Sequence, residues 1–390
     1  MKKIAIITAT RAEYGLLSPV IKELRKYEGS GLRVELIVTG THLSHLYGHT
    51  IDEIHTDGQR IDRCVEIPVN SNSEMDISYN QSETLNKFTN LFCNEKYDAI
   101  VILGDRYEML AIAIAASNTK TPIFHLCGGD TTEGAMDEWI RHSITKMSYI
   151  HFVTNLESER RVIQLGESPN RVYNYGSTSI DNILKVATLS KEAALETVGL
   201  GGCRYILCTY HPVTMENNSV DEQINHFVSA IAEFKDIQFI VTKSNADQGG
   251  ARINQLLDEA ASKLDNMHVF TSLGIKRYLS LMKYAECVVG NSSSGIIETP
   301  AFNIPTVNIG DRQRGRLQAK SIINCGVDKQ SIVEAIYKAL SNEFRMVCDE
   351  NNSLYGTGCA ASQISKKVYE LVTLDEIDLK KKFFDMEINL

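Results

Sequence analysis

Short, apolar, often β-branched runs alternate with helix-period segments along most of this 390-residue chain, and this alternation constrains the fold more than any other feature. In the first half, the expected strands are residues 2–8, 33–39, 97–103, 121–126 and 149–154. The expected helices between them are 16–28, 74–95, 107–118, 137–147 and 155–165. The pattern then repeats with strands at 204–210, 237–243, 267–272, 286–290 and 305–310, and helices at 219–235, 250–264, 275–284 and 331–343. Buried parallel strands separated by amphipathic helices predict a doubly wound α/β fold, present twice.

Residues 176–202 separate the two series. This stretch contains Gly, Ser and Thr followed by a helical pattern, as is typical of a crossover linker. We therefore expect an N-terminal domain over 1–178, a second domain over 179–360, and a C-terminal helix and charged tail over 361–390. Such sheets bind ligands at the carboxyl ends of their strands, so we expect a cleft between the two domains.

The composition excludes several classes of partner. The formal net charge of −9 argues against nucleic acid or an anionic membrane surface as the main partner. No stretch reaches the roughly 18 apolar residues of a membrane span, and the short apolar run after the first Met is not typical of a signal peptide. Nine cysteines without a C-x-x-C pair indicate reduced thiols. These features predict a cytoplasmic protein.

Polar motifs follow three of the first-half strands. Arg11 lies in TATRAEYG, where a strand-to-helix turn and a guanidinium together suit an anionic ligand. Asp105 and Arg106 lie in LGDRYE, where Asp105 is either an acid of the site or a helix N-cap. The densest stretch, LCGGDTTEGAMDEWIRHSITK, indicates acid/base chemistry, because several carboxylates near one cleft push their pKa values apart. Its charged residues are Asp130, Glu133, Asp137, Glu138, Arg141 and His142.

Two histidine motifs are less specific. His42, His45 and His49 have a spacing that a metal site could use, but the loop has no Asp, Glu or Cys before Asp52. We therefore expect substrate contact or a plain structural role there, and no metal. His211 in YHPVT precedes a proline, which restricts its backbone, and is either a ligand-binding or a core histidine.

The stretch GNSSSGIIE, residues 290–298, follows a strand and opens a helix. Glycine-flanked serines at a helix N-terminus present N–H groups and hydroxyls to phosphate oxygens, and Glu298 can accept hydrogen bonds from a ribose diol. The lysine of a P-loop is absent, so these features together suggest a nucleoside diphosphate. GDRQRGR adds Arg312, Arg314 and Arg316 after the next strand.

These motifs, in this order over residues 1–345, resemble the UDP-N-acetylglucosamine 2-epimerases, and the hydrolysing branch is the more similar. The resemblance implies the GT-B fold, a UDP-sugar as partner, a homodimer or homotetramer, and no metal or redox cofactor. It also implies anti elimination of UDP from UDP-N-acetylglucosamine, followed by hydration of a 2-acetamidoglucal to N-acetylmannosamine for sialic acid synthesis. The implied catalytic carboxylates are Asp105 and Asp137. The expected substrate-binding residues are Arg11, His42, Arg106, Arg141, His142, His211, Asn245, Ser292, Ser293, Ser294, Gly295, Glu298 and Arg312.

One position departs from the family pattern. Many hydrolysing members read H-I-E-G-G-E, with a catalytic first glutamate, whereas this chain reads HLCGGD and places Cys127 there. Either Asp130 or Glu133 supplies the displaced carboxylate, or two carboxylates suffice. The altered loop also leaves open the same reaction on UDP-N,N′-diacetylbacillosamine. The remaining alternatives are a non-hydrolysing epimerase, a GT-B glycosyltransferase and a non-catalytic UDP-sugar-binding protein.

Overall fold

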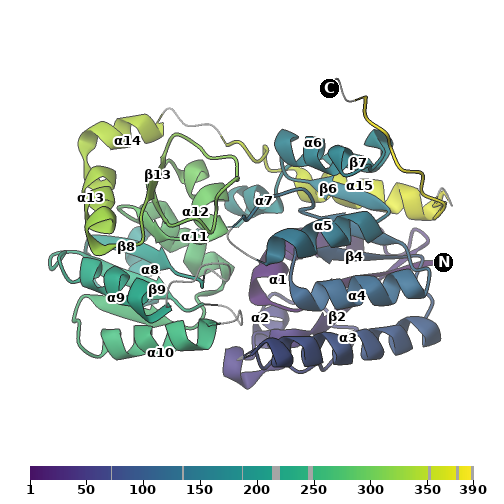
Figure 1. The fold of residues 1–390 in the computed structure, drawn as a ribbon, viewed down its shortest axis with the longest axis horizontal. Helices are drawn as coiled ribbons and strands as arrows, with labels where there is room; N and C mark the ends of the chain where they lie inside the picture. Colours follow the sequence, from purple (N-terminus) through teal and green to yellow (C-terminus); the bar gives the residue numbers. More distant parts are fainter. Residues whose placement is uncertain are drawn as a thin grey trace. The chain divides into compact units, whose positions relative to one another are not determined.

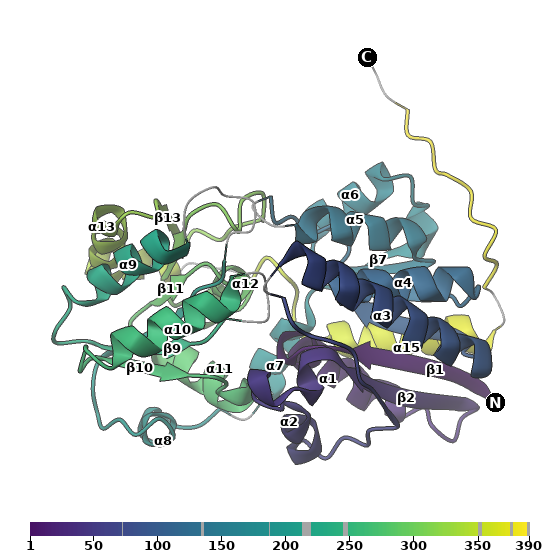
Figure 2. The same ribbon diagram turned by 60° about the horizontal axis from the view of Figure 1, so that its bottom comes forward.

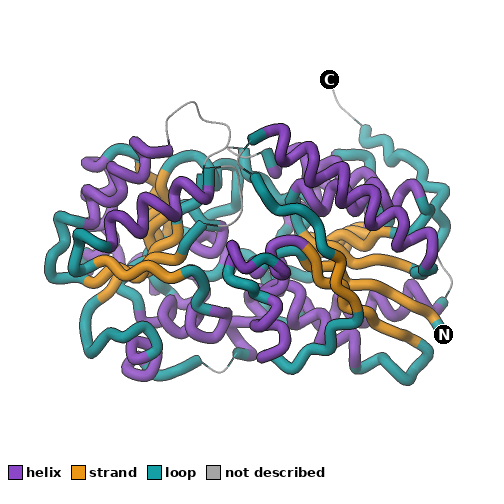
Figure 3. Tube along the Cα trace, turned by 90° about the horizontal axis from the view of Figure 1, so that it is seen from below, coloured by secondary structure: helices purple, strands orange, loops and turns teal. Residues whose placement is uncertain are grey.

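A computed structural model describes residues 1–71, 73–133, 136–186, 188–212, 220–244, 249–349, 353–374 and 377–387. The chain forms two compact units. The first comprises residues 1–131, 137–182 and 355–390, and the second comprises 132–136 and 183–354. In each unit the strands form a layer with helices on both sides (Figure 3). None of the helices in the described ranges is long and apolar enough to cross a membrane.

The first unit has a parallel sheet in the order β3-β2-β1-β4-β5-β6-β7. Figure 1 labels β2, β4, β6 and β7 of this sheet. Its strands are β1 (Lys2–Thr8), β2 (Leu32–Thr39), β3 (Arg63–Val65), β4 (Ala99–Leu103), β5 (Ile123–Leu126), β6 (Ile150–Val153) and β7 (Val172–Asn174). Because all these pairings are parallel, the carboxyl ends of the strands lie along one edge of the sheet. The strand order reverses between β1 and β4, which is where such sheets bind ligands.

The helices of the first unit are α1 (Arg11–Arg25), α2 (Ile51–Thr56), α3 (Glu74–Asn94), α4 (Tyr107–Asn118), α5 (Asp137–Met147), α6 (Leu156–Gln164), α7 (Thr178–Lys185) and α15 (Ala360–Thr373). Helices α3, α4 and α5 pack side by side in that order, and α1 packs against α15 (Figure 2). The C-terminal helix thus belongs to the same unit as the N-terminal strand.

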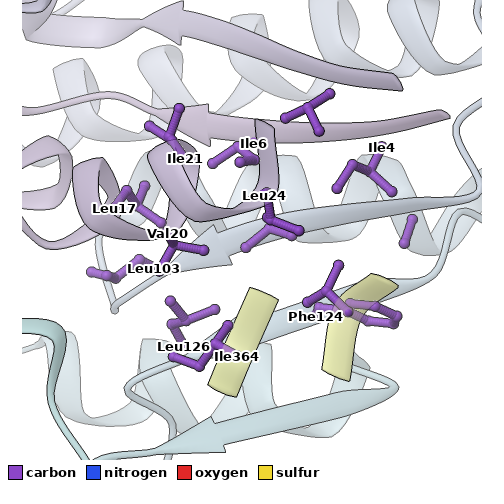
Figure 4. Close-up of a cluster of buried hydrophobic side chains, with 14 of the residues drawn as sticks. Ile4, Ile6, Leu17, Val20, Ile21, Leu24, Leu103, Phe124, Leu126 and Ile364 are labelled. Atoms are coloured by element: carbon purple, nitrogen blue, oxygen red, sulfur yellow. The ribbon is translucent and has the colours of Figure 1, made fainter. Parts of the chain in front are cut away.

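One face of the first sheet packs against α1 and α15 (Figure 4). Leu17, Val20, Ile21 and Leu24 recur at helical spacing on α1 and are fully buried in this cluster, together with Ile364 of α15. The spacing of these residues explains why α1 forms and which face it buries.

The second unit has a parallel sheet in the order β10-β9-β8-β11-β12-β13. Its strands are β8 (Tyr205–Thr209), β9 (Gln238–Thr242), β10 (Met267–Phe270), β11 (Val288–Gly290), β12 (Thr306–Ile309) and β13 (Ile322–Cys325). Its helices are α8 (Lys191–Glu196), α9 (Val220–Ile231), α10 (Gly250–Ala261), α11 (Gly274–Tyr284), α12 (Ser293–Ile297), α13 (Lys329–Leu340) and α14 (Asn342–Asp349). Helices α9, α10 and α13 share one apolar cluster, and α8 and α11 share another. The two clusters lie on opposite faces of the sheet, because alternate residues of β8 contribute to them.

The first unit extends to residue 182, in the middle of α7, where two side chains contact other parts of this unit. The Asp181 carboxylate accepts hydrogen bonds from the Ala360 and Ala361 N–H groups at 3.0 and 3.2 Å, and so caps α15. The Asn182 amide donates to the Gly15 carbonyl at 2.7 Å.

All ten expected strands are present, as are the expected helices, with shifted ends. Three strands were not expected: β3, β7 and β13. Each has only three or four residues and lies at a sheet edge, so the apolar pattern is too short to indicate it. Helix α1 also begins at Arg11, five residues before the predicted start. Thr10 and Glu13 form a capping box there.

Candidate functional site

Three neighbouring strands of the first unit, β1, β4 and β5, end at the same edge of the sheet. Each is followed by a polar segment identified from the sequence: Arg11 after β1, Asp105 and Arg106 after β4, and residues 127–130 after β5. The parallel topology therefore brings together side chains that are more than a hundred residues apart in the chain.

Arg141 of α5 links the acidic residues of this edge. Its guanidinium is 1% exposed and contacts Asp105 Oδ2 through Nε, at 3.0 Å, and through Nη2. Its Nη1 donates to Glu138 Oε2 at 2.8 Å and to the Asp130 carbonyl at 2.6 Å. Burial lowers the pKa of Arg141, but Asp105, Asp130 and Glu138 outweigh burial and raise it above the ordinary value. Arg141 is therefore a permanent cation that positions Asp105.

The turn that carries Asp105 contacts the side chain of His125 in β5. Gly104 has φ +85°, a conformation that favours glycine, and its carbonyl lies 2.8 Å from His125 Nε2. Burial lowers the pKa of His125 to about 3, so the ring is neutral at physiological pH. A neutral ring that contacts a carbonyl through Nε2 carries its proton on that nitrogen. His125 therefore positions the peptide just before Asp105.

The Asp130 side chain is engaged by hydroxyl groups of β6 and α6. Asp130 is buried, and its Oδ1 accepts hydrogen bonds from Thr154 Oγ1 at 2.7 Å and Ser158 Oγ at 2.6 Å. Gly129 precedes it with φ +78°, and a Cβ there would lie 2.3 Å from the Ser158 carbonyl. Cys127 has φ +63°, a conformation that is uncommon for a residue with a side chain. The backbone turns sharply at these residues and places the Asp130 side chain beside Thr154 and Ser158.

Glu133, the other candidate for the displaced carboxylate, lies in the second unit. Its carboxylate is half exposed and lies 3.6 Å from the Arg314 guanidinium, and its N–H donates to the Arg314 carbonyl at 3.4 Å. Asp137 and Glu138 occupy the first turn of α5, where carboxylates are favoured by the helix dipole. His142 Nε2 lies 3.2 Å from Glu138 Oε1. The Arg141 cluster thus includes Glu138, which the sequence analysis named in this stretch without assigning it a role.

His42 is fully buried beside β1, between two hydroxyl groups. Its ring contacts Thr8 Oγ1 at 3.0 Å and Thr50 Oγ1 at 2.8 Å, and burial lowers its pKa to about 3. His45 and His49 stack on each other instead, with ring centroids 4.3 Å apart. Within the described ranges, no group of three or more His, Cys, Asp and Glu residues is arranged to hold a metal ion.

In the second unit, Asn291 joins the segments after β8 and β11. Its side chain accepts from the His211 N–H at 2.7 Å and donates to the His211 carbonyl at 2.8 Å. The His211 ring contacts Ser244 Oγ at 3.1 Å. Gly290, just before Asn291, has φ +144°, and a Cβ there would lie 1.9 Å from the Thr209 carbonyl. Only glycine allows this approach of the two strand ends.

The serines after Gly290 have distinct environments. Ser292 is the N-cap of α12 and accepts from the Ser294 N–H at 3.4 Å. The Ser294 hydroxyl donates to Glu298 Oε2 and accepts from Tyr278 OH at 3.1 Å. Ser292 and Ser293 are half-buried, and Gly295 is buried against Thr306.

Two side chains from the segment after β12 reach the same turn. Arg312 Nη1 and Gln313 Nε2 donate to the Asn291 carbonyl at 3.2 and 2.9 Å. The second unit thus brings together His211, Ser292, Ser294, Glu298 and Arg312, whereas Asn245 lies outside the described residues. The sequence analysis missed Asn291, Gln313 and Tyr278. Asn291 lies within the quoted motif, so its position beside a strand end was the available signal.

Comparisons with known proteins show which family and which fold this chain resembles. Residues 22–369 match the family described as UDP-N-acetylglucosamine 2-epimerase. The chain is 39% identical to an Escherichia coli protein named "Polysialic acid biosynthesis protein P7", over 91% of this chain and 90% of that protein. It is 38% identical, over 99% of both chains, to a Campylobacter jejuni protein named "GDP/UDP-N,N'-diacetylbacillosamine 2-epimerase (hydrolyzing)".

A solved structure of UDP-N-acetylglucosamine 2-epimerase from Neisseria meningitidis, bound to UDP-N-acetylglucosamine, superimposes with a TM-score of 0.77. It is 18% identical and covers 95% of this chain and all of its own. At this identity the likeness concerns the fold alone, and with the two parallel sheets it agrees with the GT-B fold expected from the motifs.

Proposed function

Because the chain belongs to the UDP-N-acetylglucosamine 2-epimerase family, we propose that it is a hydrolysing 2-epimerase that converts UDP-N-acetylglucosamine and water into N-acetylmannosamine and UDP. The observation that carries the hydrolysing reaction is the end-to-end similarity to a relative whose name specifies it. The product would serve the synthesis of sialic acid and of surface polysaccharide, in keeping with the name of the E. coli relative.

The reaction requires two steps. In the first, a base removes the proton from C2, the C1–O bond breaks, and UDP leaves with the electron pair as a C1=C2 double bond forms. In the second, water adds its hydroxyl to C1 while an acid donates a proton to C2. This proton arrives on the face opposite to the one from which the first proton was removed, which inverts C2. Both steps need side chains that exchange protons with substrate or water, and carboxyl groups can do this.

We assign the proton transfers to Asp105 and Asp137 of the first unit. Arg141 donates two hydrogen bonds to one oxygen of Asp105, which favours the ionised carboxylate that a base must be. Asp137 is half-buried at the first residue of α5, four residues from Arg141. Asp130 accepts hydrogen bonds from Thr154 and Ser158 and thereby stabilises the loop. We therefore assign the proton transfers to Asp105 and Asp137 alone.

We assign the UDP group to the second unit. The hydroxyls of Ser292 and Ser293 and the guanidinium of Arg312 suit the diphosphate, because all three can donate to phosphate oxygens. Glu298 suits the ribose, since a carboxylate accepts hydrogen bonds from a diol. Ser294 donates to the Glu298 carboxylate, so a ribose would compete with this hydroxyl.

UDP-N,N′-diacetylbacillosamine is the second candidate substrate. The Campylobacter relative that matches 99% of this chain carries that substrate in its name. The reaction at C1 and C2 is the same, and only the substituents at C4 and C6 of the sugar differ.

The test is to incubate the purified protein with each UDP-sugar in turn, without an acceptor, and to follow the products by phosphorus and proton NMR. Free UDP with N-acetylmannosamine supports the proposal, and the larger kcat/KM of the two substrates identifies the sugar. A product that keeps its UDP would indicate a non-hydrolysing epimerase. Turnover only after an acceptor is added would indicate a glycosyltransferase, and binding without turnover a UDP-sugar-binding protein.

A further inference from the structure

Two buried glutamates lie close to the point where the strand order of the first sheet reverses. Glu13 lies in the first turn of α1, after β1, and Glu108 lies in the first turn of α4, after β4. Strands β1 and β4 are neighbours, and the two residues are only 4% and 2% exposed. Neither glutamate has a role in the reaction assigned so far. Two acids buried together need a physical explanation, because buried carboxylates are costly unless they are paired.

Each glutamate uses one carboxyl oxygen in an ordinary contact. Glu13 Oε2 accepts hydrogen bonds from the N–H groups of Ala9 and Thr10 at 2.7 and 3.1 Å. Glu108 Oε1 accepts from Arg106 Nε at 2.8 Å. The other oxygen of each, Glu13 Oε1 and Glu108 Oε2, is buried and has no hydrogen-bond partner among the described residues. One proton held between the two carboxyl groups would satisfy both of these oxygens.

The charge balance also favours one proton. Arg106 is the cation that contacts Glu108, so two ionised glutamates would leave a net negative charge in a buried place. Burial, and then the charge of Glu108, raise the pKa of Glu13 to about 8, although Arg106 and the two backbone N–H groups oppose this.

Other charged and titratable groups lie near α1. His42 is neutral, and Arg11 is close enough to lower the pKa of His42 further. Tyr14, which follows Glu13 in α1, donates its hydroxyl hydrogen bond to Asp57 Oδ2 at 2.9 Å. Asp105, beside Arg106 in the chain, is already engaged by Arg141.

We propose that Glu13 and Glu108 hold one proton between them and that this singly charged pair positions Arg106, and with it the turn that presents Asp105. Glu13 and Glu108 are thus positioning residues and touch no substrate. This role rests on the proposed 2-epimerase activity, because it predicts how that activity depends on pH. As the pH rises and the shared proton is lost, the two carboxylates repel each other, the Arg106 contact is disturbed, and Asp105 moves from its productive place.

The sharpest test compares kcat/KM as a function of pH in wild type, Glu13→Gln and Glu13→Ala, with Glu157→Gln as the control. Glu157 is an exposed acid in the first turn of α6 in the same unit. Glutamine is neutral and can donate to Glu108, as the protonated acid does. We expect Glu13→Ala to lower kcat/KM about tenfold near pH 7, since a displaced catalytic group costs that much or more. We expect Glu13→Gln to recover most of this loss and to move the alkaline limb upward by at least one pH unit. The control should leave that limb in place.

A spectroscopic readout keeps the inference testable without turnover. The infrared band of a neutral carboxylic acid should be present in wild type at pH 7, absent in Glu13→Gln, and lost from wild type above about pH 8. If both UDP-sugars remain intact in wild type, the proposed function fails, yet the infrared band still decides whether the proton is shared. If wild type turns over but Glu13→Gln leaves both the band and the alkaline limb unchanged, the shared proton is refuted and the function stands.

Discussion

The buried Arg141 guanidinium donates to Asp105 Oδ2 through Nε and Nη2, although the two residues are 36 positions apart in the chain. The contact joins the turn after β4 to helix α5, and Arg141 also contacts Glu138 and the Asp130 carbonyl. The two assigned catalytic carboxylates, Asp105 and Asp137, therefore lie on segments that one cation holds together.

Replacing Arg141 should affect both stability and turnover. Arg141→Met leaves Asp105 and Glu138 without their cation, and breaking such a pair costs about 3 kcal/mol of unfolding free energy. Arg141→Lys keeps the charge but not the two-nitrogen contact, so we expect smaller destabilisation with kcat still lowered at least tenfold. Urea denaturation and steady-state kinetics measure the two effects. Arg160→Met, on the exposed side of α6, is the matched control. Wild-type kcat in Arg141→Lys would show that the contact geometry is not needed.

Asp137→Asn should separate chemistry from nucleotide binding. The amide keeps the size of the carboxyl group but cannot exchange a proton, so kcat should fall about 10²- to 10⁴-fold. The affinity for UDP should stay within about twofold, because the assigned UDP residues belong to the second unit. Isothermal titration calorimetry with UDP and NMR of the products measure the two quantities. Unchanged turnover would remove Asp137 from the mechanism.

The resemblance to the family motif H-I-E-G-G-E implies that Cys127 stands where a catalytic glutamate is expected, so its own role needs a direct test. Cys127→Ser should keep kcat within about threefold, because the proposed steps use carboxylates and no thiol. Serine also suits the positive φ of this position about as well as cysteine does. A collapse of activity with normal thermal stability would mean that the thiol takes part.

The sequence predicted the central strands and the strand-end placement of the polar motifs, since both depend on apolar runs that a buried parallel sheet requires. It could not reveal the edge strands β3, β7 and β13, whose three or four residues carry too little pattern. It did not predict the environments of Asp130 and Glu298 either. Whether a carboxylate is free or is held by Thr154, Ser158 or Ser294 depends on side chains that only the fold brings together.

Gly290→Ala should disrupt the second unit at the turn assigned to phosphate. The new Cβ would lie 1.9 Å from the Thr209 carbonyl, and the positive φ adds strain, so β8 and β11 must separate at this point. We expect a loss of about 2–4 kcal/mol and at least a tenfold weaker affinity for UDP. Gly201→Ala is the control, because a Cβ there meets nothing within 4 Å. Normal UDP affinity in a folded Gly290→Ala protein would argue against this turn as the phosphate site.

Glu167 should make the first unit sensitive to acid. This fully buried carboxylate accepts hydrogen bonds from Lys146 at 2.5 Å, His151 at 3.1 Å and Lys381 of the C-terminal tail at 2.9 Å. Burial opposes ionisation, but these three donors outweigh it and lower the pKa of Glu167 from 4.5 to about 2.

A carboxylate whose pKa is lowered by folding adds stability above its unfolded pKa and loses it as the pH falls through the folded pKa. Glu167 should therefore add about 2–3 kcal/mol above pH 5, lost progressively between pH 4.5 and 2. Glu167→Gln should be less stable than wild type at pH 7, and the difference should shrink in acid. Urea denaturation at several pH values measures it. Lys381→Met removes one of the three donors, so it should lower the unfolding free energy at pH 7 by less than Glu167→Gln does. If the difference in unfolding free energy between wild type and Glu167→Gln stays constant between pH 7 and 3, the role of this ionised carboxylate is contradicted.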